Sequence, residues 1–250
     1  MADGGRRLER LVTVGGRLHP VALELTVTGV RVTSAGAVAP AVALLVRAWF
    51  DLDSDVVAIG RTLARDPVLA ESIAARPGLR ATQYPEPFEA AVMAVLGQQV
   101  SVAAARTFGG RAVAAFGREG ERALRSFPAP EALLAAPLDE LRAAIGVTVA
   151  RARTVHAVAA AFEGGLVLDR RGDLAEQRRL LLAIPGIGPW TADYLALRLL
   201  GDPDAFPAGD LVLRRALGRV STAEAEAASQ AWRPHRAHAA FHLWASAGAV

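Results

Sequence analysis

The sequence predicts a mainly α-helical protein, with a small α+β piece at its N-terminus and a compact helical domain after it. Apolar residues make up 52% of the 250 residues, much of that fraction is alanine, and they recur at helical spacing over most of the chain. Strand-like alternation is confined to residues 8–33. We expect the boundary near residue 80, which divides the chain into residues 1–80 and 81–250.

The N-terminal piece begins with three expected strands, which alternate apolar and polar residues over Leu11–Val14, Val21–Val27 and Val30–Thr33. The turns between them contain Gly15-Gly16 and Thr28-Gly29, residue types that tolerate tight turns. From about Pro40 the apolar period becomes helical and predicts a helix over 41–50. Ser54 is a candidate cap for a second helix.

Proline-rich breakers around residues 76–78 and 84–87 precede the helical domain. Two later helix starts have the spacing of a capping box, Asp173 with Glu176 and Ser221 with Glu224. The helices predicted in this domain cover roughly 86–97, 101–117, 130–135, 138–145, 149–163, 173–182, 189–200, 210–218, 222–231 and 235–247.

The composition excludes several kinds of chemistry. The chain has no cysteine, so it forms no disulfide, thiolate zinc site, iron–sulfur cluster or cysteine nucleophile. Its five histidines form no HExxH pattern. His235, His238 and His242 lack acidic companions at ligand spacing, so we interpret them as a polar helix surface and not as a metal site.

The formal net charge is +3, and all 28 basic side chains are arginine. Arginine pairs well with phosphate, so this balance permits nucleic-acid binding, although a genome-wide bias against lysine codons explains the count equally well. No apolar run is long enough to span a bilayer, and residues 1–7 have no apolar segment behind their charges. We therefore expect a soluble cytoplasmic protein without a membrane partner.

Residues 180–198 predict two helices joined by the tight turn Pro185-Gly186-Ile187-Gly188. Glycine allows the backbone to turn sharply and to approach a ligand closely, and Pro189 suits the first turn of the following helix. The free amides at that helix start would face an anion such as a DNA phosphate. A plain helix–helix turn would explain the two glycines alone.

Asp210 follows a Pro/Gly loop and begins another apolar-periodic helix. Taken alone, it is a good helix N-cap. A carboxylate in a dry pocket could also stabilise a cation that develops during a reaction, and the two roles are compatible.

The turn, the Trp190-Thr191-Ala192 that follows it and Asp210 together resemble the helix-hairpin-helix DNA glycosylase superfamily. From about residue 40 to the end the chain is most similar to the DNA-3-methyladenine glycosylase II family. This resemblance implies a helical glycosylase domain and an N-terminal piece like the TATA-binding protein, here shortened. It also gives Asp210 the role of the catalytic carboxylate.

The resemblance implies DNA contacts for Gly186, Gly188 and Thr191 in the hairpin and for Gln98 and Gln99 before it. Gln99 corresponds to the side chain that fills the space of a flipped nucleotide. A solvated turn, with Ser101 capping the next helix, is the competing interpretation of both glutamines. The resemblance also implies a monovalent cation, sodium or potassium, at the backbone carbonyls of Leu182, Ile184 and Ile187, and no required cofactor.

The resemblance places Trp190, Tyr194 and Trp244 around the extruded base, where ring faces attract a cationic methylated purine. Ordinary aromatic packing is the alternative for all three. Trp232 is expected to pack, and Asp193 to be an exposed or structural acid.

Two positions depart from the family, because Leu211 and Ala245 stand where larger or more polar aromatic residues are expected, which predicts a more open pocket.

The predicted function is removal of alkylated purines, of the 3-methyladenine and 7-methylguanine type, from double-stranded DNA. Relatives that also cut the backbone carry a lysine where Trp190 stands here, and its amine forms a Schiff base. We therefore expect a monofunctional glycosylase that acts as a monomer at the nucleoid. The alternatives are a non-catalytic helix-hairpin-helix DNA-binding protein and a glycosylase for deaminated or oxidised bases.

Overall fold

A computed structural model gives the fold and describes residues 6–26 and 28–248. The described chain is mainly helical with one small antiparallel sheet at its N-terminal end, which confirms the predicted fold class. Val27, which the strand prediction includes, lies outside the described residues. None of the described helices combines the length and the apolar character needed to cross a membrane.

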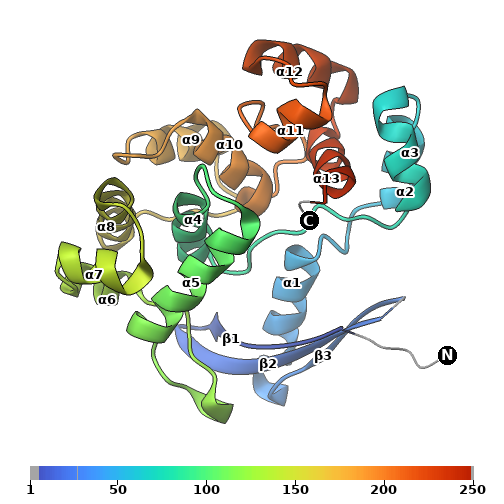
Figure 1. The fold of residues 1–250 in the computed structure, drawn as a ribbon. Helices are drawn as coiled ribbons and strands as arrows, with labels where there is room; N and C mark the ends of the chain where they lie inside the picture. The colour runs from blue at the N-terminus through green and yellow to red at the C-terminus, as the bar shows by residue number, and fades with distance from the viewer. Residues whose placement is uncertain (1–5, 27, 249–250) are drawn as a thin grey trace.

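The sheet consists of β1 (Arg6–Val14), β2 (Arg17–Thr26) and β3 (Gly29–Thr33), paired antiparallel in that order. Gly15 and Gly16 connect β1 to β2 with φ angles of 57° and 75°, a region that glycine adopts without strain. Helix α1 (Ala39–Trp49) stands on one face of the sheet (Figure 1). The packing between them is formed by Val12, Val21, Leu23, Val42 and Val46.

Twelve further α-helices follow α1 in the described chain (Figure 1). They are α2 (Val56–Leu63), α3 (Pro67–Ala75), α4 (Pro87–Leu96), α5 (Val102–Phe116), α6 (Pro130–Ala135), α7 (Leu138–Ile145), α8 (Val149–Glu163), α9 (Leu174–Leu182), α10 (Pro189–Leu195), α11 (Leu211–Ala216), α12 (Thr222–Ser229) and α13 (Arg236–Ser246). Each helix predicted after residue 80 is present, with small differences at the ends.

The helices before residue 80 differ from the sequence predictions in two ways. Helix α3 is present although the sequence did not predict it as a separate element. Ser54 does not cap α2, because the Asp55 side chain lies next to the first turn and accepts from the amide of Ala58 at 2.9 Å. The Ser54 hydroxyl instead donates to Asp51 Oδ1 at 2.5 Å.

The two predicted capping boxes differ in completeness. Ser221 and Glu224 form a reciprocal box at the start of α12. Asp173 caps α9 by accepting from the amides of Ala175 and Glu176, but the Glu176 carboxylate pairs with Arg179 instead of reaching back. Both helix starts are therefore confirmed. The complete capping box, in which the glutamate also accepts from the N-cap amide, is confirmed only for Ser221 and Glu224.

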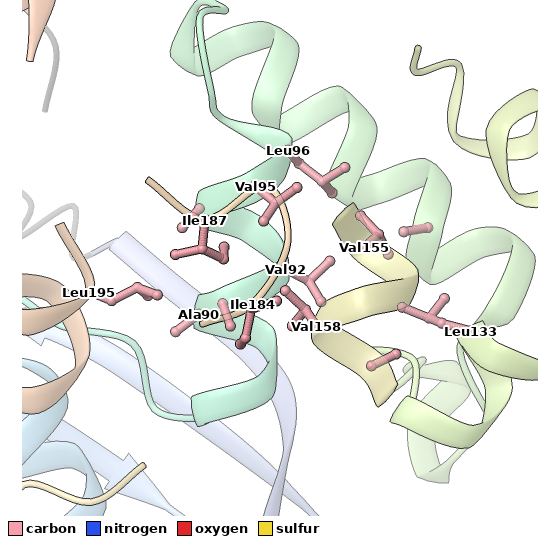
Figure 2. Packing of buried hydrophobic residues seen from close by; sticks show 14 of the residues in the cluster. Ala90, Val92, Val95, Leu96, Leu133, Val155, Val158, Ile184, Ile187 and Leu195 are labelled. Carbon is pink, nitrogen blue, oxygen red and sulfur yellow. The ribbon is translucent and has the colours of Figure 1, made fainter. Parts of the chain in front are cut away.

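The larger core surrounds α4, whose apolar side chains are buried on several sides (Figure 2). One side of α4 faces α8, and another faces the loop between α9 and α10 through Ile184 and Ile187. These two loop residues are buried together with Val92, Val95, Leu96, Val155, Val158 and Leu195. The core thereby fixes the α9–α10 loop against the centre of the protein.

A second core joins α3 to the C-terminal helix α13. Leu69 and Ile73 of α3 pack with Phe241 of α13 and with Trp232, which is buried as predicted. The Trp232 indole also donates to Asp66 Oδ2 at 2.7 Å. The sequence boundary near residue 80 falls in an irregular segment, Arg76–Glu86, and a division into two domains there stays a prediction.

His238 and His242 are buried on α13, so their interpretation as a polar helix surface is wrong. His238 Nε2 lies 3.0 Å from Asp51 Oδ2, and His242 Nδ1 lies 3.1 Å from the Ser72 hydroxyl. Helix α13 is buried from Arg236 to Ala245, so its polar positions do not mark a solvent face. Among the described residues no group of three or more histidine, aspartate and glutamate side chains is arranged to hold a metal ion.

The buried His242 makes the stability of the protein depend on pH. Burial, with the nearby charges of His238 and Arg76, lowers the pKa of His242 from 6.5 to about 4. The unfolded chain therefore binds a proton more readily than the folded one between these values, and stability falls as pH drops from 6.5 towards 4. We expect the melting temperature to fall over this window and to fall less in His242→Gln. Equal slopes in both proteins would contradict this account.

Candidate active site

The loop between α9 and α10 forms a tight hairpin on the surface of the larger core. Gly186 has a φ of 88°, and a Cβ there would lie 2.0 Å from Thr154 Oγ1 of α8. Glycine is therefore needed for both the backbone angle and the close packing. Gly188 is the N-cap of α10 and has no capping side chain, and Pro189 opens the helix. The two predicted helices and the tight turn between them are therefore present.

The loop after α4 is held against this hairpin by Gln98. The Gln98 side-chain amide donates to the carbonyl of Gly186 at 3.1 Å and to the Thr191 hydroxyl at 3.0 Å. The guanidinium of Arg151 donates to the Gln98 backbone carbonyl. The Gln98 side chain thus joins two loops of the protein, which the interpretation as a plain solvated turn did not anticipate.

Gln99 and Ser101 occupy the rest of the same loop. Gln99 is exposed and has a φ of 54°, which is uncommon for a residue with a side chain. Ser101 caps α5 by accepting from the amide of Ala104 at 3.2 Å. The strained backbone at Gln99 therefore sits at the outer tip of the loop, with a helix fixed directly after it.

Asp210 is the N-cap of α11, as the sequence predicts. Its Oδ1 accepts from the amides of Val212 at 2.9 Å and Leu213 at 3.0 Å. Two indoles also donate to the same carboxylate, Trp190 to Oδ2 at 3.1 Å and Trp244 to Oδ1 at 3.2 Å. Four N–H groups from α10, α11 and α13 therefore hold this half-buried side chain in one orientation.

The groups that hold the Asp210 carboxylate form no ion pair with it. Amide and indole N–H groups carry partial charges, whereas an arginine partner would cancel the charge in an ion pair. Among the described residues, the groups that bind this carboxylate are uncharged. Oδ2 accepts one hydrogen bond and retains capacity for another. The arrangement can present a full negative charge to a neighbouring group.

The predicted aromatic set comes together beside Asp210. Trp190 and Tyr194 stack with ring centroids 5.4 Å apart, and Tyr194 meets Trp244 edge-on at 6.1 Å. All three line a cavity of about 370 Å³ that also has Asp210 in its wall. The polar edges of the two tryptophans hold the carboxylate, while their rings belong to the cavity wall. These three residues therefore pack against one another and line the cavity at the same time.

A wider groove of about 1230 Å³ adjoins this cavity and shares Trp190 and Asp210 with it. The loop after α4 and the hairpin border the groove on one side, and the start of α11 borders it on the other. Leu211 is exposed there, whereas Ala245 is buried, and the more open pocket stays a prediction. Residues lining the groove include Gln98, Gln99, Arg106, Gly186, Gly188 and Arg215.

Thr191 and Asp193 do not line the small cavity. Thr191 contributes to the groove wall, but it is almost fully buried and its hydroxyl accepts from Gln98. Asp193 pairs with Arg178 at 2.9 Å. Burial raises the pKa of Asp193, and the Arg178 guanidinium opposes this shift. Asp193 lies outside the cavity that contains Asp210 and is half-buried.

Several residues of the small cavity were not predicted from the sequence, among them Thr82, Tyr84, Arg198 and Phe241. Thr82 and Tyr84 come from the irregular segment before α4, so residues outside the helices contribute to the pocket. Arg198 could have been found, since it continues the four-residue spacing of Trp190 and Tyr194. Tyr84 and Phe241 are far from these residues in the sequence, and no local pattern connects them.

Comparison with family models matches residues 92–235 to the model described as "HhH-GPD superfamily base excision DNA repair protein". Residues 9–85 match the model of the AlkA N-terminal domain. The first match covers most of the helical region, and the second covers the sheet and the segment up to α4.

Two curated relatives resemble the chain. It is 44% identical over 207 residues to the "probable bifunctional transcriptional activator/DNA repair enzyme AlkA" of Mycobacterium tuberculosis, which covers 79% of this chain and 41% of the relative. It is 35% identical over 178 residues to DNA-3-methyladenine glycosylase 2 of Escherichia coli, over 70% of this chain and 63% of that one. The chain thus matches less than two thirds of the length of either relative.

A solved structure, a 3-methyladenine DNA glycosylase from Archaeoglobus fulgidus, superimposes with a TM-score of 0.85. The match covers 97% of this chain and 87% of the other, at 24% sequence identity. This likeness shows a shared fold.

Proposed function

The chain belongs to the HhH-GPD superfamily of base excision DNA repair proteins, and we propose that it is a DNA glycosylase that removes alkylated purines of the 3-methyladenine and 7-methylguanine type. The observation that carries the proposal is the Asp210 carboxylate, held by four N–H donors in the wall of an aromatic cavity. A protein that only binds DNA needs neither the unpaired carboxylate nor the cavity.

The proposed reaction hydrolyses the bond between sugar C1′ and the ring nitrogen of the base. As this bond breaks, its electron pair leaves with the base and positive charge develops on the sugar. The negative charge of Asp210 stabilises that cation, and its free Oδ2 capacity can orient the attacking water. Water adds to C1′, its proton passes to solvent, and the base is released. A base alkylated on a ring nitrogen is already cationic and leaves as a neutral molecule.

The base reaches Asp210 only after it has been extruded from the duplex. The cavity of about 370 Å³ can enclose a flat purine against a wall to which Trp190, Tyr194 and Trp244 contribute. These electron-rich faces attract a cationic base. Gln99, exposed at the tip of its loop and bordering the groove, is positioned to fill the vacated space in the stack.

We assign the wider groove to the DNA backbone. Gly186 and Gly188 border it, and their small size lets a phosphate approach the hairpin amides. Arg106 and Arg215 line the same groove and supply positive charge. Thr191 and Gln98 act indirectly in this proposal, because they fix the hairpin to the loop that carries Gln99.

We propose that the cation expected from the family binds at the hairpin. The carbonyl of Ile184 accepts one hydrogen bond, from the amide of Ile187 at 3.0 Å, and keeps a second lone pair. Within the described residues the carbonyls of Leu182 and Ile187 accept no backbone hydrogen bond. Three such oxygens suit sodium or potassium, and a bound cation would add positive charge beneath a phosphate. No cofactor enters the proposed reaction.

A single chain supplies the carboxylate, the cavity and the hairpin, so we propose that a monomer suffices for the reaction. We propose that it acts on DNA in the cytoplasm, at the nucleoid.

We expect Asp210→Asn to keep the fold and duplex binding and to lose base release by roughly 10²- to 10³-fold, the cost of removing a preorganised electrostatic group. Single-turnover release should be measured on duplexes that each carry one defined base: 3-methyladenine, 7-methylguanine, hypoxanthine or 8-oxoguanine. Asp55→Asn makes the same change at the exposed cap of α2 and should be without effect. A fully active Asp210→Asn protein would refute the catalytic assignment. A wild-type chain that binds the duplexes but releases no base would favour a DNA-binding protein.

We expect no covalent adduct when borohydride is added during a reaction with damaged DNA. A Schiff base requires an amine, and Trp190 stands at the position in question. Because the chain contains no lysine, the N-terminal amine is the one group left for such chemistry. Gel analysis of the borohydride-treated mixture tests this expectation, with a lysine-bearing glycosylase as the positive control. A trapped protein–DNA band, or strand cleavage at the abasic product without added base, would show that the enzyme is not monofunctional.

A further inference from the structure

Arg198 lies in the π-helical turn Ala196–Leu200, which continues α10. Its side chain lines the same cavity as Asp210. The central carbon of its guanidinium is 5.3 Å from the ring centroid of Tyr84, 5.9 Å from that of Tyr194 and 5.2 Å from that of Phe241. π-helical turns are frequent at functional sites, because the extra residue changes the direction of the side chains.

The guanidinium of Arg198 contacts aromatic rings, whereas many other arginines of the chain donate to oxygen atoms. Its Nε is buried without a hydrogen-bond partner, and Arg198 forms no ion pair among the described residues. By contrast, Arg10 lies over Trp49 and also pairs with Glu89. Ring faces stabilise a cation but do not satisfy a planar set of five N–H donors. Arg198 therefore has donors that a molecule in the cavity can use.

The cavity thus contains two unpaired and opposite charges. Asp210 is bound by neutral N–H groups, and Arg198 is bound by aromatic faces. Arginine stays protonated at any physiological pH, so its charge is permanent. A site meant solely for cationic bases would gain nothing from a fixed positive charge in its wall, since that charge repels the ligand.

The chemistry of the leaving base explains why both charges are useful. When the C1′–N bond breaks, the electron pair moves onto the base. A cationic alkylated base becomes neutral, but a neutral damaged base becomes an anion and then takes a proton from water. The first departure needs no help, and the second needs a donor near the developing negative charge.

We propose that Arg198 donates hydrogen bonds to the departing base and so allows the enzyme to release neutral damaged purines that carry carbonyl or ring-nitrogen acceptors. This inference rests on the proposed glycosylase function. Asp210 stabilises the sugar cation for every substrate, whereas Arg198 acts on the base and matters for those that leave as anions.

The test compares Arg198→Met with the wild type on a duplex containing hypoxanthine, a neutral base, and on one containing the cationic 7-methylguanine. Methionine keeps an unbranched apolar stem but removes the charge and the donors. We expect single-turnover release of hypoxanthine to fall about 10- to 100-fold, the effect of losing a hydrogen bond from a charged group, and release of 7-methylguanine to change less than about threefold. Arg198→Gln, which keeps a neutral donor, should lose less hypoxanthine release than Arg198→Met.

The ratio of the two rates within one protein preparation does not depend on how much of that preparation is folded. Arg61→Met makes the same change on the exposed surface of α2 and should leave the ratio unchanged. Equal losses on both bases in Arg198→Met would overturn the inference and indicate a structural role for Arg198. A wild type that releases 7-methylguanine and not hypoxanthine would also overturn it, while leaving the proposed function intact. Release of neither base would refute both.

Discussion

The architecture around the cavity depends on one requirement, which is to hold a carboxylate beside aromatic rings without a cationic partner. Four N–H donors hold Asp210 in place. Two donors come from the first turn of α11, and the others are indoles of α10 and α13. These three helices must therefore converge at one point. The hairpin packed on α8 fixes the start of α10, and the second core fixes α13.

The helical part of the fold was predictable because its signals are local. Apolar period, caps and prolines lie within a few residues of the helix ends they determine, as at Ser221 and Pro189. The sequence prediction was wrong where the environment of a side chain depends on residues that are distant in the sequence. Helix α13 is buried almost along its whole length, so its period identifies no solvent face, and the buried His238 and His242 were misinterpreted. Their partners, Asp51 and Ser72, are far away in the sequence.

The candidate site was predictable in its parts and not in its assembly. Asp210 is recognisable as a helix cap from its neighbours, and the aromatic residues follow from the family resemblance. The indole bonds that join them span 20 and 34 residues, and no sequence pattern specifies such contacts. Likewise, no sequence pattern predicts that the side-chain amide of Gln98 donates to the carbonyl of Gly186, 88 residues away. Arg198 shows the opposite case, a local spacing that points to the pocket and was overlooked.

The central claim is that the charge of Asp210 recognises a cation at the sugar. It is tested most directly by binding to two non-cleavable duplexes, one with a pyrrolidine nucleotide, whose ring nitrogen is cationic at neutral pH, and one with an uncharged tetrahydrofuran nucleotide. A mimic of the charged transition state should bind more tightly than its neutral counterpart. We predict that the wild type prefers the pyrrolidine duplex by about tenfold or more. Asp210→Asn should lose that preference while binding the tetrahydrofuran duplex as before. An undiminished preference in Asp210→Asn would contradict the account.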